Sequence, residues 1–409
     1  MIKAITVENF FSFDGKTKIE LNPQTNILVG INGCGKSNFI KAIRLLYECI
    51  VGEGFEKLFM KDWSGFGFVA NFNESQSDYI RIIYEFDKEL IFKSLNNQGY
   101  KFPKNPIYEL TIHQSGSTSY YLEERLFTES TQKSNKEPFV FLEMRNGRGI
   151  ISTREKGQIG LQRYSPEENT IPFKTQETVL RQVSDPDRFY PIYTIKSAIE
   201  SLIVYDYFDT TLSSKIRQPA SFGVEPRLLP SGENLAQILN RLKNQNTLYY
   251  EKVQDLIKKI NPYFIDTGFD LLGSLLYLVL REQKLSRSVG ARNISDGTLR
   301  YLLLLTILYN PERGKLICID EPEIGLHPDM INTISDAIKF ASKDSQLIIA
   351  THSPLLLNSF DLDDILIFEK NAENKSIVSV KSEADFEGWD GEFLAGQMWL
   401  RGQIGGKRW

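Results

Sequence analysis

The stretch that most constrains this chain is Gly30–Ser37, GINGCGKS, which fits the pattern G-x-x-x-x-G-K-[ST]. The apolar run Ile27–Val29 precedes it and an amphipathic pattern follows, so the sequence predicts a strand, a glycine-rich loop and a helix. The glycines let successive backbone N–H groups turn toward one centre, and the helix adds its positive end there. This stretch therefore predicts a phosphate-binding loop.

Each residue of the loop has an expected role. Lys36 would reach the β- and γ-phosphates, and the Ser37 hydroxyl would ligate Mg²⁺. The remaining phosphate contacts would come from a further group of loop residues: Gly30, Asn32, Gly33, Gly35 and Asn38. The alternative for the loop alone is a glycine-rich turn that binds nothing, and the motifs downstream weigh against it.

An acidic pair follows a second apolar strand. Leu316–Ile319 ends in Asp320 and Glu321. A buried parallel strand projects its last side chains at the edge of the sheet where a phosphate loop opens. Asp320 suits a Mg²⁺ contact through water, and Glu321 suits a general base that orients the attacking water. The alternative is two charges that merely end a strand.

Two further motifs carry phosphate chemistry. His352, in ATHSP, follows the apolar strand Gln346–Ala350 and is expected beside the γ-phosphate, with a structural histidine as the alternative. Ser295 and Gly297, in SDGTLR, open a helix and would form a second phosphate-binding surface. Ser-Asp-Gly also caps ordinary helices. The segment from Arg281 to Arg300 is rich in basic residues, and we interpret it first as a solvated face and second as a nucleic-acid contact.

Composition excludes several classes of protein. The 48 basic and 52 acidic residues give a net charge of −4, so no global basic field points to nucleic acid. The three cysteines, Cys34, Cys49 and Cys318, are too few for a disulfide framework or a zinc site and indicate a reducing compartment. The N-terminus has no cleavable signal pattern, and the apolar runs are shorter than the ~18 residues of a membrane span. We expect a soluble cytoplasmic protein with no membrane contact.

The pattern of predicted elements suggests a split α/β core. Residues 1–60 and 290–385 would form this core, with residues 61–184 as a β-rich insert of period-two strands and residues 386–409 as a C-terminal tail. Residues 185–289 would be a mainly helical insert. In it we expect helices near Asp187–Tyr207 and Gly232–Ile260, and a β-hairpin of Phe264–Leu271 and Leu275–Arg281.

The order of these motifs resembles the ABC-type ATPases of the RecF/SMC class. It is most similar to the single-chain predicted AAA-family ATPases (AAA_21-like) of bacterial DNA repair or phage defence. The resemblance implies an α/β fold, namely a P-loop NTPase core of ABC-ATPase type with an antiparallel β lobe and an inserted mainly helical subdomain. It also implies ATP and Mg²⁺ as cofactors. The positions that match the Walker A, Walker B and switch motifs are Lys36, Ser37, Asp320, Glu321 and His352.

The same resemblance implies a partner subunit. Ser295–Gly297 matches the signature motif, which acts on the nucleotide held by the other subunit, so a homodimer or higher homo-oligomer would form through an ATP sandwich. Glu323–Pro328 matches the D-loop at that interface. Gln182 is the candidate for the Q-loop glutamine near the nucleotide and Mg²⁺, with Gln158 and Gln162 as rivals.

Three functions compete at this point. The first is an ATP-hydrolysing dimeric switch in DNA repair or antiphage defence, with a separate effector protein such as a nuclease and with DNA as a further partner. The second is the ATPase subunit of a membrane transporter, from which SDGTLR departs because transporters carry LSGGQ. The third is a non-hydrolysing nucleotide-binding scaffold for a nuclease. Glu321 argues against the third, because a general base is needed only for hydrolysis.

Overall fold

The computed structural model describes residues 1–71, 78–116, 119–130, 137–154, 162–164, 173–386 and 394–405. The chain divides into two compact units. The first comprises Met1–Pro23, Gly30–Leu202 and Phe368–Ser379, and the second Gln24–Val29, Ile203–Ile367 and Val380–Trp409. The phosphate loop belongs to the first unit and the acidic motif to the second. The units thus cut across the predicted boundaries, which grouped both motifs in one domain.

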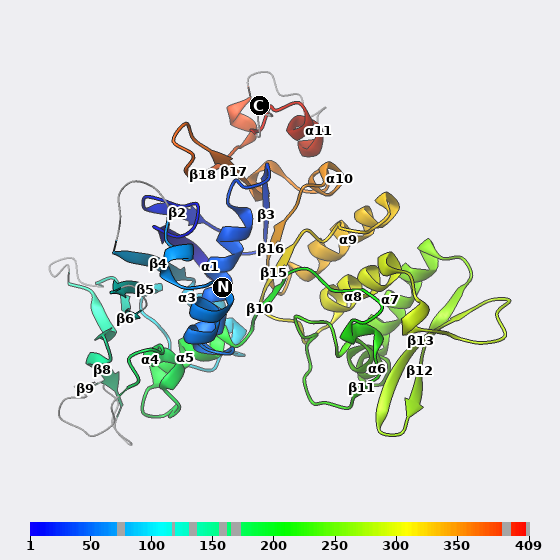
Figure 1. Cartoon of the computed structure of the whole chain (residues 1–409), viewed down its shortest axis with the longest axis horizontal. Coiled ribbons are helices and arrows are strands. Elements are labelled where there is room, and N and C mark those ends of the chain that lie inside the picture. The colour runs from blue at the N-terminus through cyan, green and yellow to red at the C-terminus, as the bar shows by residue number, and fades with distance from the viewer. Residues whose placement is uncertain are drawn as a thin grey trace. The chain divides into compact units, whose positions relative to one another are not determined.

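The first unit is built on an eight-stranded antiparallel sheet of order β2-β1-β4-β5-β6-β7-β8-β9 (Figure 1). Along β4 the side chains alternate between buried and half-buried, which confirms the period-two pattern expected for the β-rich insert. The strands are β1 (Ile2–Glu8), β2 (Thr17–Glu20), β4 (Tyr79–Phe86), β5 (Pro106–Ser115), β6 (Ser119–Thr128), β7 (Phe139–Arg145), β8 (Arg148–Thr153) and β9 (Gln162–Tyr164).

Helix α1 (Lys36–Ile50) lies against this sheet. Its apolar face is buried, and the Tyr84 hydroxyl of β4 donates to the Ala42 carbonyl at 2.6 Å. Helices α4 and α5 also pack on α1. The other helical segments of the unit are a π-helical turn (Glu56–Asp62), α2 (Phe66–Val69), α3 (Lys88–Ser94), α4 (Val179–Gln182) and α5 (Tyr190–Ile199).

The second unit contains a sheet of order β10-β15-β16-β3-β17. Strand β16 is parallel to β15 and to β3, and all of its residues are buried, as expected for a central parallel strand. Asp320 of β15 is paired with Ala350 of β16, which is paired with Leu28 of β3. The three carboxyl ends therefore meet at one edge. The bounds are β3 (Thr25–Gly30), β10 (Leu202–Tyr205), β15 (Leu316–Asp320), β16 (Gln346–Ala350) and β17 (Ile365–Lys370).

Helices cover this parallel sheet. Helix α8 is buried along Tyr301–Tyr309 and forms the centre of the hydrophobic core of the unit. The helices are α6 (Leu235–Gln245), α7 (Thr247–Ile260), α8 (Asp296–Tyr309), α9 (Pro328–Ala341), α10 (Pro354–Leu357) and α11 (Ala395–Leu400). A smaller sheet joins β11 (Ala220–Ser221), β12 (Phe264–Leu272), β13 (Leu275–Glu282) and β14 (Val289–Gly290).

The middle of the chain agrees with the sequence in part. The predicted hairpin is confirmed as β12 and β13, and the helical region Gly232–Ile260 contains α6 and α7. The helix expected near Asp187–Tyr207 was wrong at its end, because α5 stops at Ile199 and Leu202–Tyr205 is the buried strand β10. Among the described residues, no helix is both long enough and apolar enough to cross a bilayer.

Candidate active site

The phosphate loop of the first unit has the backbone that its sequence predicts. Gly33 and Gly35 adopt φ values of +78° and +113°, which side-chain-bearing residues rarely adopt. A Cβ on Gly30 would lie 2.3 Å from the Phe368 carbonyl oxygen, so only glycine fits there. Lys36 is 5% exposed, and its ammonium donates to the Gly30 carbonyl at 2.8 Å. The lysine charge therefore lies inside the curl of the loop.

Two serines support the loop from behind. Ser376 of β18 (Ser376–Val380) donates to the Cys34 carbonyl at 2.7 Å, and its hydroxyl lies 2.7 Å from that of Ser12. Asn38, predicted as a nucleotide contact, donates its side-chain amide to Ser12 Oγ at 2.8 Å. Asn32, Gly33 and Ser37 are exposed. Burial raises the pKa of the Cys34 thiol, so Cys34 fills space in the loop and is no thiolate nucleophile.

The predicted acidic pair lies in the second unit, where β15 ends. Glu321 follows Asp320 with φ +50°, and its N–H donates to the Ala350 carbonyl at 2.8 Å. Glu321 Oε1 lies 3.5 Å from His352 Nε2. The predicted base and the predicted switch histidine are therefore neighbours. The N–H of Thr351 donates to the Leu28 carbonyl of β3 at 3.0 Å, so this pair lies beside the strand that leads into the phosphate loop.

Glu323 is a residue whose role here the sequence did not reveal. Its Oε1 accepts hydrogen bonds from the Thr351 hydroxyl and from the His352 N–H, both at 2.7 Å. Glu323 thereby ties the end of β16 to the loop after β15 and fixes the backbone of the switch histidine. The sequence places Glu323 only in the predicted D-loop segment. The available signal was a third carboxylate, two residues after the predicted base.

A cavity of about 210 Å³ opens beside Glu321 in the second unit. Asp206, Asp320 and Arg300 line its polar side, and it is large enough to hold several waters. The Arg300 guanidinium stacks over the Tyr207 ring at 4.6 Å and donates to the Ile324 carbonyl at 3.3 Å. This arrangement keeps a positive charge and an open cavity next to the predicted base.

The signature segment forms an exposed helix N-terminus. Ser295 is the N-cap of α8, and its Oγ accepts from the Thr298 N–H at 3.2 Å. A Cβ on Gly297 would lie 2.7 Å from the Gly325 carbonyl oxygen, so this glycine packs directly on the D-loop segment. The Ser295 hydroxyl donates to Thr298 Oγ1 at 2.7 Å, and Ser295 and the positive end of α8 lie at an exposed surface that suits an anion from outside the chain.

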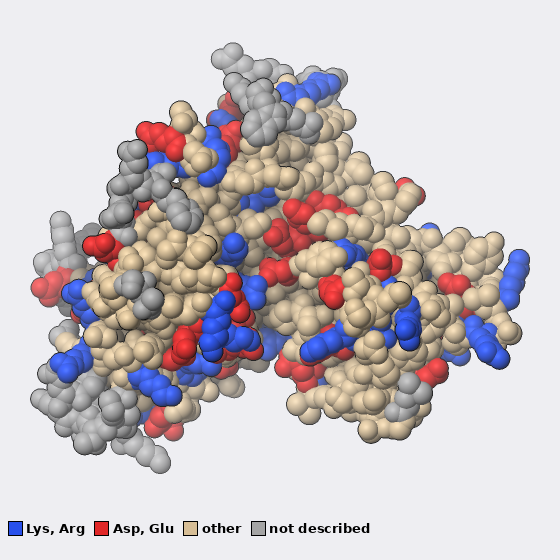
Figure 2. Space-filling model, viewed as in Figure 1, with Lys and Arg blue, Asp and Glu red and all other residues tan. Residues whose placement is uncertain are grey.

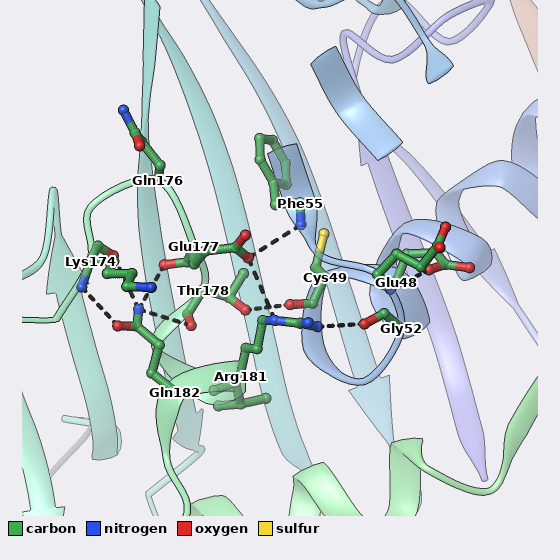
Figure 3. Close-up of polar contacts among 12 residues, drawn as sticks. Glu48, Cys49, Gly52, Phe55, Lys174, Gln176, Glu177, Thr178, Arg181 and Gln182 are labelled. Atoms are coloured by element: carbon green, nitrogen blue, oxygen red, sulfur yellow. Dashed lines mark hydrogen bonds and ion pairs between the residues drawn. The ribbon is translucent and has the colours of Figure 1, made fainter. Parts of the chain in front are cut away.

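Gln182 is the sequence-predicted site residue that the structure places elsewhere. Its side-chain amide donates to the Lys174 carbonyl at 3.0 Å and accepts from the Lys174 N–H at 2.7 Å (Figure 3). Its neighbour Thr178 donates to the Cys49 carbonyl at 2.7 Å, at the C-terminal end of α1. Lys36 is at the opposite end of α1 from Cys49. At ~1.5 Å per residue, the length of this helix places roughly 20 Å between Cys49 and Lys36.

The prediction that Gln182 binds the nucleotide and ligates Mg²⁺ is therefore wrong, because its amide closes a local turn at the far end of α1. Its rival Gln158 lies outside the described residues, and Gln162 belongs to β9 at the edge of the eight-stranded sheet.

The basic segment predicted between Arg281 and Arg300 does not act as one patch. Arg281 makes a bidentate ion pair with Asp266, with Nε 2.6 Å from Oδ1, and Arg300 is engaged as described above. Lys284, Arg287 and Arg292 are exposed. On the face in view, acidic and basic side chains are interspersed (Figure 2).

Three proteins of known name are similar to this chain in sequence. The chain is 22% identical over 422 residues to "Retron Ec83 probable ATPase" of Escherichia coli, which covers 92% of this chain and 73% of the relative. It is 26% identical over 172 residues to UvrABC system protein A of Aquifex aeolicus (strain VF5), covering 41% of this chain and 18% of the relative. It is 29% identical over 153 residues to the Old nuclease of Escherichia phage P2, covering 32% and 24%. The matches thus span less than a quarter of the last two relatives.

Solved structures share the fold. The SMC head bound to the C-winged helix domain of ScpA has a TM-score of 0.55 at 15% identity, covering 94% of this chain and 99% of that one. The SMC head with an extended coiled coil bound to the C-terminal domain of ScpA, from Pyrococcus furiosus, has a TM-score of 0.53 at 14% identity, covering 94% and 97%. These likenesses confirm the predicted P-loop NTPase fold of ABC type.

The family model AAA_21, described as "AAA domain, putative AbiEii toxin, Type IV TA system", matches residues 25–358. This range includes the phosphate loop, the signature segment, the acidic pair and the switch histidine. The chain therefore belongs to the AAA_21 family.

Proposed function

We propose that this chain is a Mg²⁺-dependent, ATP-hydrolysing dimeric switch. The observation that carries the proposal is the Glu321–His352 pair, 3.5 Å apart at the carboxyl ends of β15 and β16. A carboxylate beside an imidazole, next to the strand that continues into a phosphate loop, suits activation of water for attack on a phosphoryl group. A scaffold that only bound nucleotide would not need this pair.

The residues take distinct roles in the proposed reaction. Lys36 binds the β- and γ-phosphates, and the amides of the loop orient them. Ser37 and Asp320 would hold Mg²⁺, which neutralises the charge on the phosphate oxygens. Glu321 orients the attacking water and accepts its proton. His352, whose backbone Glu323 fixes, senses the γ-phosphate through its imidazole.

The proposed site is completed by a second copy of the chain. Ser295 and the Gly297 N–H, at the exposed start of α8, would bind the γ-phosphate held by the partner. Two protomers would then enclose two nucleotides, with the Glu323–Pro328 segment at the interface. Differential affinity for the closed dimer is what allows ATP to act as a switch.

The biological role that we propose is antiphage defence or DNA repair in the cytoplasm, together with a separate effector protein such as a nuclease. Its support is the similarity to the retron ATPase, which covers 92% of this chain, and the shorter match to the Old nuclease. Direct contact with DNA would use the exposed Lys284, Arg287 and Arg292 beyond β13.

The test of turnover is Glu321→Gln. The amide cannot accept the proton of water, so the rate of ATP hydrolysis should fall ~10²–10⁴-fold, the usual contribution of a general base. ATP affinity, measured by titration calorimetry, should stay near the parental value because Lys36 is unchanged. Glu312→Gln is the control, since Glu312 is an exposed carboxylate of the same unit paired with Arg241. Hydrolysis by Glu321→Gln at the parental rate would refute the assignment of the base.

A further inference from the structure

Arg217 is a buried arginine to which no motif draws attention. It ends the short helical turn Lys215–Arg217 and is 3% exposed. Its guanidinium donates to the carbonyls of Ala291 and Ile294, both at 2.7 Å, and of Arg292 at 3.2 Å. On its other sides it donates to the Thr210 carbonyl at 2.8 Å and to Asp296 Oδ1 at 2.5 Å. All three of its nitrogens are used.

These bonds converge on the segment that precedes α8. Ser295 lies between Ile294 and Asp296, and the side chain of Arg217 binds both of these neighbours. Asp296 is the first residue of α8, so the same guanidinium fixes the start of the helix. A planar, permanently charged guanidinium presents five donors in a rigid fork, so it can bridge acceptors on several sides at once. Burial strengthens these bonds and makes their loss costly.

We infer that Arg217 is a positioning residue for hydrolysis, which sets Ser295 and the N-terminus of α8 in the orientation that binds the γ-phosphate held by a second copy. This inference rests on the proposed function and adds to it a residue that touches neither ATP nor Mg²⁺. A misplacement of about 1 Å can lower a reaction rate ~10²-fold. Loss of the Arg217 hydrogen bonds should therefore lower the rate of ATP hydrolysis at the partner's site by about that factor.

The first test uses homodimers. Arg217→Gln should keep the parental affinity for ATP, because the phosphate loop of its own chain is untouched, and should lower kcat about 10²-fold. Arg217→Lys keeps the charge but cannot reach acceptors on all sides, so it should show a smaller loss of the same kind. If Arg217→Gln unfolds below the assay temperature, Arg217→Lys takes its place in the measurement of kcat and ATP affinity. A parental kcat in both variants, or loss of ATP binding in both, would overturn the inference.

The second test asks in which chain Arg217 acts. Lys36→Ala has a dead phosphate loop and an intact signature segment. Ser295→Asp keeps a good helix cap, but its carboxylate repels phosphate. Its signature segment is therefore inactive, while its phosphate loop is intact. Mixed with Lys36→Ala, Arg217→Gln should recover activity, because its intact loop meets an intact signature segment. Mixed with Ser295→Asp, it should stay inactive. Recovery in the second mixture, or in neither, overturns the inference.

A control mixture separates this inference from the proposed function. A mixture of Lys36→Ala and Ser295→Asp should recover ATP hydrolysis at one site of two. If this mixture stays inactive, the proposal of a site shared between chains is refuted, and the inference about Arg217 is refuted with it. Arg313→Gln is the matched variant. Arg313 is 8% exposed and donates to the Asn310 carbonyl at 2.9 Å, beyond the other end of α8. It should keep kcat within a few-fold of the parent. The same selective recovery with Arg313→Gln would count against a specific role for Arg217.

Discussion

Glu321 holds an unfavourable backbone conformation at the point where β15 ends. A non-glycine residue at φ +50° costs of order 1 kcal/mol or more and persists only where the surroundings hold it. Here its N–H is fixed to the Ala350 carbonyl at 2.8 Å. The turn directs the Glu321 carboxylate toward His352 and away from the strand direction. The strain is therefore located at the residue that we propose as the base.

We predict that removal of the Glu323 carboxylate lowers both the stability of the chain and its kcat for ATP. Glu323→Ala would leave the buried Thr351 hydroxyl and the His352 N–H without their acceptor, which costs about 1–3 kcal/mol each in unfolding free energy. Because His352 would then lose its fixed position, kcat for ATP should fall about 10²-fold with little change in ATP affinity. Glu323→Gln keeps one oxygen as acceptor and should retain most of kcat. Equal kcat values for Glu323→Ala and the parent would contradict the positioning role.

Residue roles could be predicted where a short motif carries them. Asp320, Glu321 and His352 lie at or just after strand ends, and Lys36 begins the helix after β3, so the spacing of the apolar runs was enough to place them. Gln182 was misassigned because the role of a glutamine depends on what the fold brings to it, and here that is the main chain of Lys174. Arg217 could not be found from sequence, since its partners around Ser295 lie more than 70 residues away.

At the scale of elements, long periodic segments were predictable and short apolar runs were not. The strands β15 and β16 begin and end within one residue of their expected places, and helices α1 and α8 begin where the phosphate loop and SDGTLR predict them. The sequence predicts that Leu202–Tyr205 ends a helix, whereas the structure has strand β10 there. A run of four apolar residues fits both the helical and the strand periodicity, so it does not distinguish the two. The segment is a strand because it pairs with β15 in the sheet. This pairing depends on the tertiary structure, so local sequence does not predict it.

Helix α4 is joined to the antiparallel sheet by a buried acid. Glu124 of β6 accepts from the Val179 N–H at 2.5 Å and from the Tyr108 hydroxyl at 2.8 Å. Burial raises the pKa of Glu124 to about 7, against the lowering effect of these hydrogen bonds. The folded chain therefore holds this proton more tightly than the unfolded chain, whose carboxyl has a pKa of about 4.5.

The sign of the pH effect follows from that difference. Stability from this group is present in full below pH 4.5 and is lost as the pH rises toward 7, by about 3 kcal/mol at 1.36 kcal/mol per pKa unit. Glu124→Gln cannot titrate, so its stability relative to the parent should improve by that amount between pH 4.5 and pH 8. Urea denaturation at both pH values measures the change. Glu143→Gln, an exposed carboxylate on β7, is the control. A parent-to-variant gap that does not vary with pH would rule out the buried titration.

At the scale of the whole molecule, neither compact unit contains all the chemical motifs. The phosphate loop and its serine supports belong to the first unit, whereas the base, the switch histidine and the signature segment belong to the second. The chain passes from one to the other within β3, between Val29 and Gly30. Sequence periodicity predicts elements and cannot predict this partition, because compactness depends on which faces pack together.

The prediction at this scale is dimerisation driven by ATP. Glu321→Gln should bind Mg-ATP and remain in the closed state, because hydrolysis no longer reopens it. A ligand that binds only the closed state at 100 times its Kd stabilises that state by about 2.7 kcal/mol per site, or about 10²-fold in the dimer dissociation constant. Two enclosed nucleotides should give about the square of that factor. Sedimentation equilibrium of Glu321→Gln with and without Mg-ATP measures the shift directly.

Two variants define how this dimerisation experiment is read. Combined with Glu321→Gln, Lys36→Ala removes the charge that holds the phosphates, so its dimer dissociation constant should not respond to Mg-ATP at any concentration up to saturation of the parent. Ser295→Asp in the same background should still bind ATP within its own chain but should not dimerise, because the added carboxylate faces the γ-phosphate of the partner. Both outcomes follow from a nucleotide enclosed between the loop of one chain and the signature segment of the other. A Glu321→Gln protein that stays monomeric in saturating Mg-ATP, or a Ser295→Asp double variant that dimerises as tightly as Glu321→Gln alone, would show that the nucleotide is not shared between chains.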